Sequence, residues 1–156
     1  METLHTIRKW LDRIVGTICI FLFALMVVVG SYQIITRFIF NNPSTISEEL
    51  LTYSFAWMAM FATAYVFGKR DHMRMTFVVD KLAPAQRKVL EIVLEILVIA
   101  FAVIVLIYGG FNIMGLTMTQ KTASLGVMMG QVYAVVPVSG ILIAIYGILN
   151  VVDLCK

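Results

Sequence analysis

The sequence contains few charged side chains, few histidines and few cysteines. Only 13% of its 156 residues are Asp, Glu, Lys or Arg, about half of the share that soluble domains carry. His5 and His72 lie outside the long apolar stretches, which excludes a haem held by imidazoles between membrane helices. Cys19 and Cys155 lie too far apart in a membrane topology to pair. No glycine-rich phosphate loop, metal-spaced cluster or nucleophile beside a base is present, so we expect neither an enzyme nor a bound cofactor.

Long stretches without Asp, Glu, Lys or Arg dominate the chain instead, at residues 14–36, 50–68, 96–120 and 122–152. A helix of about 20 apolar residues crosses the hydrocarbon of a bilayer. Lipid offers no partner to a free backbone N–H or C=O group, and a helix pairs these groups within itself. The sequence therefore predicts an all-α integral membrane protein with one four-helix domain, and with spans at about 14–36, 50–68, 89–113 and 131–152.

Ten of the twelve Lys and Arg residues lie on one side of these spans. They fall before the first span, between the second and third spans, and after the fourth span, whereas the opposite side has only Arg37 and Lys121. Because Lys and Arg concentrate in cytoplasmic loops, this distribution predicts that both termini are cytoplasmic. The net charge of +3 then reflects topology, and we expect no nucleic-acid partner.

Two short segments outside the spans have the spacing of amphipathic helices at a membrane surface. Residues 1–13 carry apolar side chains three and four residues apart, and a similar pattern recurs within residues 69–88. Both segments are expected to lie in the plane of the cytoplasmic leaflet. Residues 114–130 are expected to form an outer connection of undefined structure.

The hinge at residues 37–50 brings charge between the first two spans. Ser47 directly precedes Glu48 and Glu49, so its hydroxyl can cap a helix while the carboxylates lie near the positive end of the helix dipole. Helix initiation explains the two glutamates about as well as a functional role does. The functional hypothesis is that Arg37, Glu48 and Glu49 pair with one another or with a partner protein and form a docking surface.

Two further groups of charged residues flank the cytoplasmic ends of the spans. A basic group could bind phospholipid headgroups, although its effect on topology explains it slightly better; its members are Lys69, Arg70, His72 and Arg74. Glu91 and Glu95 lie four residues apart at the start of the third span and could form a proton or cation site. Local ion pairs with Arg87 and Lys88 are the more economical explanation of these glutamates.

Several motifs in a fixed order give the chain a recognisable pattern. They are Gln33-Ile34-Ile35-Thr36-Arg37-Phe38-Ile39-Phe40, then Ser47-Glu48-Glu49-Leu50 with Tyr53, Phe55 and Trp57, then His72, Phe77, Asp80, Leu82 and Pro84-Ala85-Gln86. With this pattern the chain resembles, over roughly residues 5–152, the small four-helix membrane subunit (DctQ type) of TRAP transporters, the tripartite ATP-independent periplasmic systems. Ile46 departs from the family, which commonly has Trp there, and so does the segment 62–64, where Gly is common.

The resemblance implies a small scaffold subunit in a bacterial inner membrane. Its implied partners are a large membrane subunit, which carries the solute and sodium sites and moves as an elevator, and a periplasmic solute-binding protein. The implied activity is sodium-coupled uptake of an organic acid such as sialic acid or a C4-dicarboxylate, with Na⁺ held by the large subunit. The residues fit this role, because the middle of every predicted span is apolar and offers no solute site.

Two other classes remain open on the sequence alone. A self-associating small exporter or channel would carry flux without a partner. A purely structural membrane-assembly protein would leave uptake unchanged when it is deleted.

Overall fold

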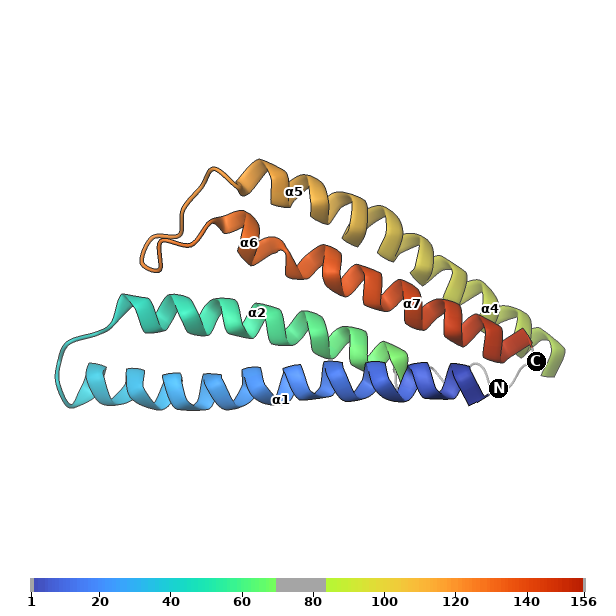
Figure 1. The fold of residues 1–156 in the computed structure, drawn as a ribbon, viewed down its shortest axis with the longest axis horizontal. Coiled ribbons are helices and arrows are strands. Elements are labelled where there is room, and N and C mark those ends of the chain that lie inside the picture. Colours follow the sequence, from blue (N-terminus) through green and yellow to red (C-terminus); the bar gives the residue numbers. More distant parts are fainter. Residues whose placement is uncertain (1, 70–83, 156) are drawn as a thin grey trace.

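The computed structural model describes residues 2–69 and 84–155, which form two antiparallel helix pairs (Figure 1). The helices are α1 (Glu2–Phe38), α2 (Thr45–Gly68), α4 (Pro84–Phe101), the π-helix η1 (Ala102–Gly109), α5 (Gly110–Thr117), α6 (Met129–Tyr133) and α7 (Val135–Cys155). The segments α4, η1 and α5 follow one another directly, and we call them together the third rod. Four stretches are long and apolar enough to cross a membrane: Thr6–Phe38, Thr45–Gly68, Gln86–Thr117 and Met129–Leu154. The predicted fold class is therefore confirmed.

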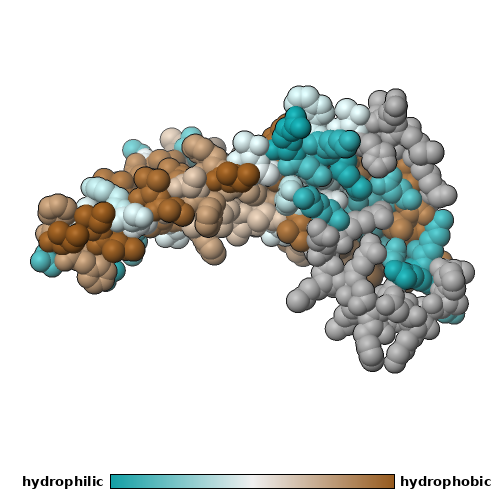
Figure 2. All heavy atoms as spheres, turned by 90° about the horizontal axis from the view of Figure 1, so that it is seen from below, coloured by the Kyte–Doolittle hydropathy of each residue, from teal (hydrophilic) through white to brown (hydrophobic). Residues whose placement is uncertain are grey.

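The contact between α2 and α7 joins the two pairs. α1 packs along α2, the third rod packs along α7, and both termini lie at the same end of the molecule (Figure 1). We call this the terminal end, and the opposite end, where the connections 39–44 and 118–128 lie, the loop end. On the α1 side, apolar residues cover the part toward the loop end, and hydrophilic residues gather near the terminal end (Figure 2). This pattern fits a membrane span with a polar boundary.

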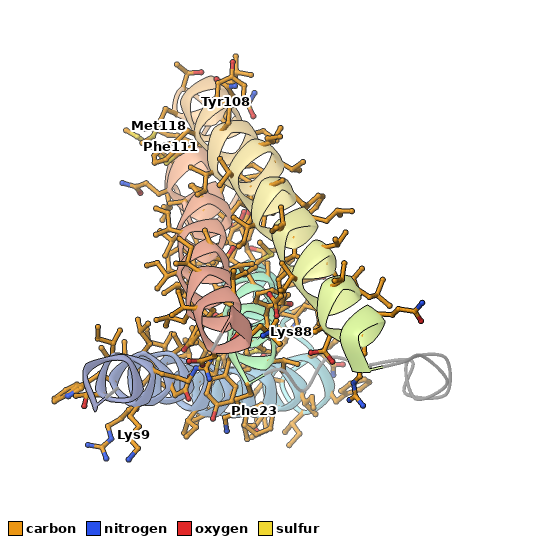
Figure 3. All side chains as sticks on the ribbon, turned by 90° about the vertical axis from the view of Figure 1, so that its right-hand side faces the viewer. Lys9, Phe23, Lys88, Tyr108, Phe111 and Met118 are labelled. Carbon is orange, nitrogen blue, oxygen red and sulfur yellow. The ribbon has the colours of Figure 1, made fainter. Side chains whose placement is uncertain are left out.

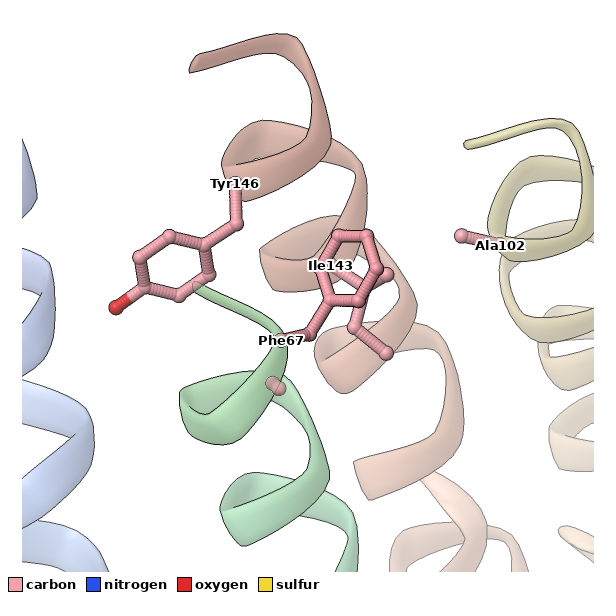
Figure 4. Close-up of a cluster of buried hydrophobic side chains, with 5 residues drawn as sticks. Phe67, Ala102, Ile143 and Tyr146 are labelled. Atoms are coloured by element: carbon pink, nitrogen blue, oxygen red, sulfur yellow. The ribbon is translucent and has the colours of Figure 1, made fainter. Parts of the chain in front are cut away.

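The buried side chains centre on α7. Half of the most apolar stretch of the α7 span is buried inside the molecule, against 6% for α1 and for the third rod. Tyr146 and Ala102 have no exposed surface and pack with Phe67 and Ile143 (Figure 4). In contrast, Phe23 on α1 and Tyr108 on the third rod point away from the bundle (Figure 3). α1 and the third rod therefore present wide apolar faces to their surroundings.

Small residues let α7 and the third rod approach closely. A Cβ atom at Gly140 would lie 2.7 Å from the Leu106 Cβ atom, and one at Gly147 would lie 2.5 Å from the Ile99 Cγ1 atom. Such distances are too short for any larger side chain, so both positions need glycine for this packing. The two glycines lie seven residues apart, about two turns, on the side of α7 that faces the third rod.

Several boundaries differ from the sequence-based expectation. Residues 1–13 do not form a separate surface helix, because α1 runs without a break from Glu2. The N-cap of α2 is Ser44, whose side chain accepts a hydrogen bond from the Ser47 N–H group, so the expected cap at Ser47 is wrong. The third rod extends to Thr117 and α6 begins at Met129, so helix occupies both ends of the expected connection 114–130. The surface segment expected within residues 69–88 lies largely outside the described residues.

The fourth span is interrupted near Pro137. α6 ends at Tyr133, Ala134 forms a turn, and α7 begins at Val135. Proline has no N–H group, so Pro137 cannot donate to the carbonyl of residue 133 in a continuous helix. The missing hydrogen bond explains why the break falls one turn before the proline.

Candidate functional site

Within the described residues, the side-chain hydrogen bonds that join distant parts of the chain gather in two places where helices meet. The first, which we call the loop contact, joins the start of α2 to the connection before α6. Glu49 Oε1 accepts from the Ala123 N–H group at 3.0 Å, and Glu49 Oε2 accepts from Ser124 at 2.9 Å and Leu125 at 2.7 Å. Tyr53 also donates its hydroxyl to Glu49 Oε1 at 2.9 Å. One carboxylate thus fixes three consecutive residues of a connection that is distant in sequence.

The local structure on both sides prepares the loop contact. The cap at Ser44 starts α2 early enough to place Glu49 in its second turn. In the connection, Thr122 donates its N–H group to the Val127 carbonyl at 2.8 Å, and Gly126 has a φ of +69° that favours glycine. This tight turn aligns the three N–H groups that Glu49 binds. About two turns further along α2 than Glu49, the Trp57 indole donates to the Val132 carbonyl at 2.9 Å and joins α2 to α6.

The second place, which we call the terminal contact, joins α1, α4 and α7 near the chain termini. Arg8 donates through Nη2 to Asn150 Oδ1 and lies 3.3 Å, through Nη1, from Asp153 Oδ2. The Asn150 amide donates in turn to Glu95 Oε1 at 3.1 Å. Asn150 is fully buried. Its two hydrogen bonds connect the Arg8 guanidinium group on α1 to the Glu95 carboxylate on α4.

A further hydrogen bond strengthens the terminal contact. The Tyr146 hydroxyl on α7 donates to Asp12 Oδ1 on α1 at 2.7 Å. Tyr146 fits because Gly68, at the end of α2, leaves room for its ring: a Cβ atom at Gly68 would lie 2.5 Å from Tyr146 Cε1. The terminal contact therefore involves all four long helices.

The structure does not bring the predicted docking residues together. Arg37 lies over the Phe38 ring, with Cζ 5.9 Å from the ring centroid, and no ion pair within residues 2–69 and 84–155 joins it to Glu48 or Glu49. Glu48 is exposed, whereas Glu49 binds the 123–125 connection. The mutual pairing considered for these three residues is therefore absent from the described chain.

The other predicted residues divide between local and distant contacts. Arg87 Nε lies 3.3 Å from Glu91 Oε1, as a local pair would require. Glu95 instead contacts Asn150 on α7, and Lys88 is exposed. Lys69 holds its Nζ atom 4.4 Å from the centroid of the Tyr65 ring. The remaining basic residues of the predicted lipid group, Arg70, His72 and Arg74, lie outside the described residues.

The sequence reasoning missed most of the terminal contact, namely Arg8, Asp12, Tyr146, Asn150 and Asp153. One available signal was that Asn150 and Asp153 lie three residues apart at the end of an apolar span, on one side of the helix. A buried amide in a membrane helix requires a polar partner. That requirement could have suggested a contact with the charged residues that precede the first span.

Both contacts join helices through hydrogen bonds, and the terminal contact adds an ion pair. Within residues 2–69 and 84–155, no group of three or more His, Cys, Asp or Glu side chains could hold a metal ion. The polar atoms of the two contacts are directed at one another and at backbone groups. The fold and these contacts define an integral membrane protein with four spans, in which polar contacts join the two helix pairs at both ends of the bundle.

Comparison with known proteins assigns this chain to a family. The model of the DctQ component of tripartite ATP-independent periplasmic transporters matches residues 26–156, and the chain belongs to this family. Its members are transporter components and not enzymes, so the chain is a small permease subunit of a TRAP transporter.

Two relatives illustrate the relationship. The sialic acid TRAP transporter small permease protein SiaQ of Vibrio cholerae is 30% identical over 158 residues, which cover 98% of this chain and 88% of that protein. The sialic acid TRAP transporter permease protein SiaT of Haemophilus influenzae is 24% identical over 142 residues. That match covers 91% of this chain but only 22% of SiaT. A segment of SiaT that is similar to most of this chain therefore forms part of a much longer permease.

Proposed function

We propose that this subunit is a rigid support for a large permease subunit in the sodium-coupled uptake of an organic acid. The observation that carries the proposal is the position of the polar contacts. They fasten the two helix pairs at the loop end and at the terminal end, while the wide faces of α1 and the third rod stay apolar and uncovered. A bundle whose helix pairs are joined at both ends is suited to stay rigid while a partner subunit moves against it.

The partner proposed is the large TRAP membrane subunit. SiaT contains a segment similar to this chain within a longer permease, which supports the view that the two parts work side by side. In this arrangement the large subunit binds Na⁺ and solute and moves its transport domain as an elevator, and the small subunit is the fixed wall. A periplasmic solute-binding protein delivers the solute.

Sialic acid is the first substrate to test, because the relative that covers nearly the whole chain is named for sialic acid. A C4-dicarboxylate is the second. The proposed location is the bacterial inner membrane with both termini in the cytoplasm, which follows from the excess of Lys and Arg on the terminal side. The loop contact then faces the periplasm.

Reconstitution in vesicles tests the supporting role. Vesicles would contain the small subunit alone, the large subunit alone, or both, with the solute-binding protein outside and an inward sodium gradient. We expect uptake of labelled sialic acid only when both subunits are present. Loss of uptake when the sodium gradient is removed would support the coupling.

Two outcomes would contradict this proposal. Flux through the small subunit alone would favour a self-associating exporter or channel. Full uptake by the large subunit alone would leave the small subunit as an assembly protein without a part in transport.

A second experiment tests docking at the loop end. Arg37 and Glu48 are exposed there, so we propose that they contact the large subunit or the solute-binding protein. Arg37→Glu is expected to lower uptake about tenfold, equivalent to about 1.4 kcal/mol of lost interaction, with an unchanged amount of protein in the membrane. Lys121→Glu, a charge reversal elsewhere at the loop end, is the control. Normal uptake by the Arg37 variant would mean that Arg37 only anchors the helix at the lipid headgroups.

A further inference from the structure

One exposed face of the third rod carries two polar side chains among apolar neighbours. Tyr108 is 70% exposed and points away from the bundle (Figure 3), and Asn112, four residues later, is also exposed. Gly115 follows on the same side of the helix, and a Cβ atom there would have no neighbour within 4 Å outside its own stretch of helix. We call Tyr108, Asn112 and Gly115 the rod face. Within residues 2–69 and 84–155, neither of its polar side chains makes a hydrogen bond.

Contacts with the fourth span show how deep Asn112 lies. A Cβ atom at Gly110 would be 2.8 Å from Pro137 Cδ, and one at Gly130 would be 2.6 Å from the Met114 carbonyl oxygen. Asn112 lies midway between Gly110 and Met114, so it is level with the residues between Gly130 and Pro137. This is the stretch in which α6 ends and α7 begins.

The same level can be followed across α2 to α1. Trp57 donates to the Val132 carbonyl at 2.9 Å, so α2 reaches this level at Trp57. A Cβ atom at Gly16 of α1 would lie 3.6 Å from Tyr65 Cε2. Because α1 and α2 are antiparallel (Figure 1) and Trp57 precedes Tyr65 by eight residues, the level meets α1 about eight residues after Gly16, near Ala24.

This level lies inside the hydrocarbon of a bilayer. Ala24 is close to the middle of the stretch 14–36, which has no Asp, Glu, Lys or Arg side chain. A helix of about 20 residues crosses the hydrocarbon, so the Asn112 amide is far from both boundaries. Lipid tails offer an amide neither a donor nor an acceptor, and a polar group without a partner is unfavourable there. The rod face therefore requires a polar partner at this depth.

Several other exposed polar side chains in the spans need no such partner. Four hydroxyls each donate to a carbonyl four residues earlier in their own helix, namely those of Thr17, Ser31, Thr52 and Thr63. On α1 near the depth of Asn112, the exposed side chains of Phe21, Phe23 and Val27 are apolar. At this depth α1 thus suits lipid, whereas the rod face suits a protein.

We propose that the rod face binds a membrane helix of the large permease subunit, and that a polar side chain of that helix pairs with the Asn112 amide. An amide can both donate and accept, so a hydroxyl, an amide or a carboxyl group of the partner can pair with it. Gly115 lets the partner backbone approach closely, and the Tyr108 ring packs beside it. The inference rests on the supporting role proposed above. The choice of partner is supported by SiaT, in which a segment similar to this chain lies within a longer permease.

Photocrosslinking in the membrane tests which face contacts the permease. The photoreactive residue p-benzoylphenylalanine replaces Tyr108 in one variant and Phe23 in its control, because both are exposed aromatic side chains on outer helices. Each variant is produced together with the large subunit, with a different tag on each chain, and the membranes are irradiated. We expect the Tyr108 variant to form an adduct that carries both tags, and the Phe23 variant to form none.

Each contrary adduct would overturn the proposal. An adduct with the large subunit from Phe23 alone would place the interface on α1. An adduct of two small subunits from Tyr108 would identify a second copy of this chain as the occupant. The absence of any protein adduct from Tyr108 would mean that the rod face contacts lipid.

Substitutions at Asn112 test the hydrogen bond itself. Asn112→Leu should lower the amount of large subunit that copurifies with the small subunit about tenfold, and Asn112→Gln, which keeps an amide, should restore most of it. Thr17→Leu is the control, because the Thr17 hydroxyl already donates within α1. Each variant alone should unfold in detergent as the unchanged subunit does, which excludes misfolding as the cause. Undiminished copurification with Asn112→Leu would overturn the role of the amide.

Uptake by the reconstituted subunits separates this inference from the supporting role. If uptake needs both subunits but Tyr108 forms no adduct with the permease, the assignment of the rod face is wrong and the supporting role stands. If the large subunit alone takes up solute, the supporting role fails, whichever protein Tyr108 contacts.

Discussion

The loop contact and the terminal contact fasten the same two helix pairs by different means. At the loop end a single carboxylate, Glu49, binds three backbone N–H groups of one short connection. At the terminal end, side chains from three helices form a chain that runs from Glu95 through Asn150 to Arg8 and Asp153. Loss of the first contact should release a connection, whereas loss of the second should loosen the packing of whole helices.

The largest effect is expected from Asn150→Leu in the terminal contact. Leucine cannot replace the amide, so Arg8 and Glu95 would both lose the partner that connects them. Removing one member of a buried polar network destabilises a protein by about 3 kcal/mol. Unfolding of the purified protein in detergent would measure the change.

The matched control for this variant is Asn112→Leu. Asn112 is exposed on α5, and a surface change of this kind should alter stability by less than about 0.5 kcal/mol. If the two substitutions changed the free energy of unfolding equally, the hydrogen bonds of the buried Asn150 amide would contribute nothing to stability beyond the packing of its side chain.

A smaller and more local effect is expected from Glu49→Gln in the loop contact. The amide has one acceptor oxygen in place of two charged ones, so part of the hold on residues 123–125 is lost. Hydrogen bonds to a charged group contribute about 2 kcal/mol, so the N–H groups of Ala123, Ser124 and Leu125 should exchange with solvent about 30-fold faster.

Glu48→Gln is the natural control, because Glu48 is exposed beside Glu49. It should leave exchange at residues 123–125 unchanged. If Glu49→Gln lowered the free energy of unfolding as much as Asn150→Leu does, the loop contact would also hold whole helices together and not only one connection.

The smallest of the three effects is expected from Tyr146→Phe, which removes only the hydrogen bond to Asp12 and keeps the ring. A single such bond contributes about 1 kcal/mol, measurable by the same unfolding experiment. Tyr108→Phe should have no effect, because Tyr108 is 70% exposed on the third rod. A neutral result at Tyr146 would assign the stability of the terminal contact to its other members, Arg8, Glu95, Asn150 and Asp153.

The four spans could be read from the sequence because their signal is local. About 20 consecutive apolar residues suffice to predict a membrane helix. The first two predicted spans lie within α1 and α2, the third lies within the third rod, and the fourth covers α6 and α7 with the turn at Ala134 between them. The ends of the helices could be predicted less precisely, because a helix also continues through polar residues. α1 therefore includes residues 2–13, and the third rod includes residues 114–117.

The two polar contacts could not be read in the same way. Glu49 and its three N–H partners lie 74 to 76 residues apart, and Arg8 and Asn150 lie 142 residues apart. No periodicity or spacing within one helix indicates such a pairing. The sequence drew attention to Glu49 as a docking residue, but its contact with residues 123–125 depends on how the helix pairs are placed.

The π-helix η1 has a consequence for how the length of this chain can vary. A π-helix has hydrogen bonds between residues i and i+5, so each hydrogen bond encloses one more residue than it does in an α-helix. In η1 the extra residue is absorbed between Phe101 and Gly110, while α4 packs against α7 and α5 packs mainly against α6. A chain that lacked one residue in this stretch would regain α-helical geometry there and keep the packing of α4 and α5. Residues 102–109 are thus a place where a single-residue deletion can be accommodated inside a membrane span.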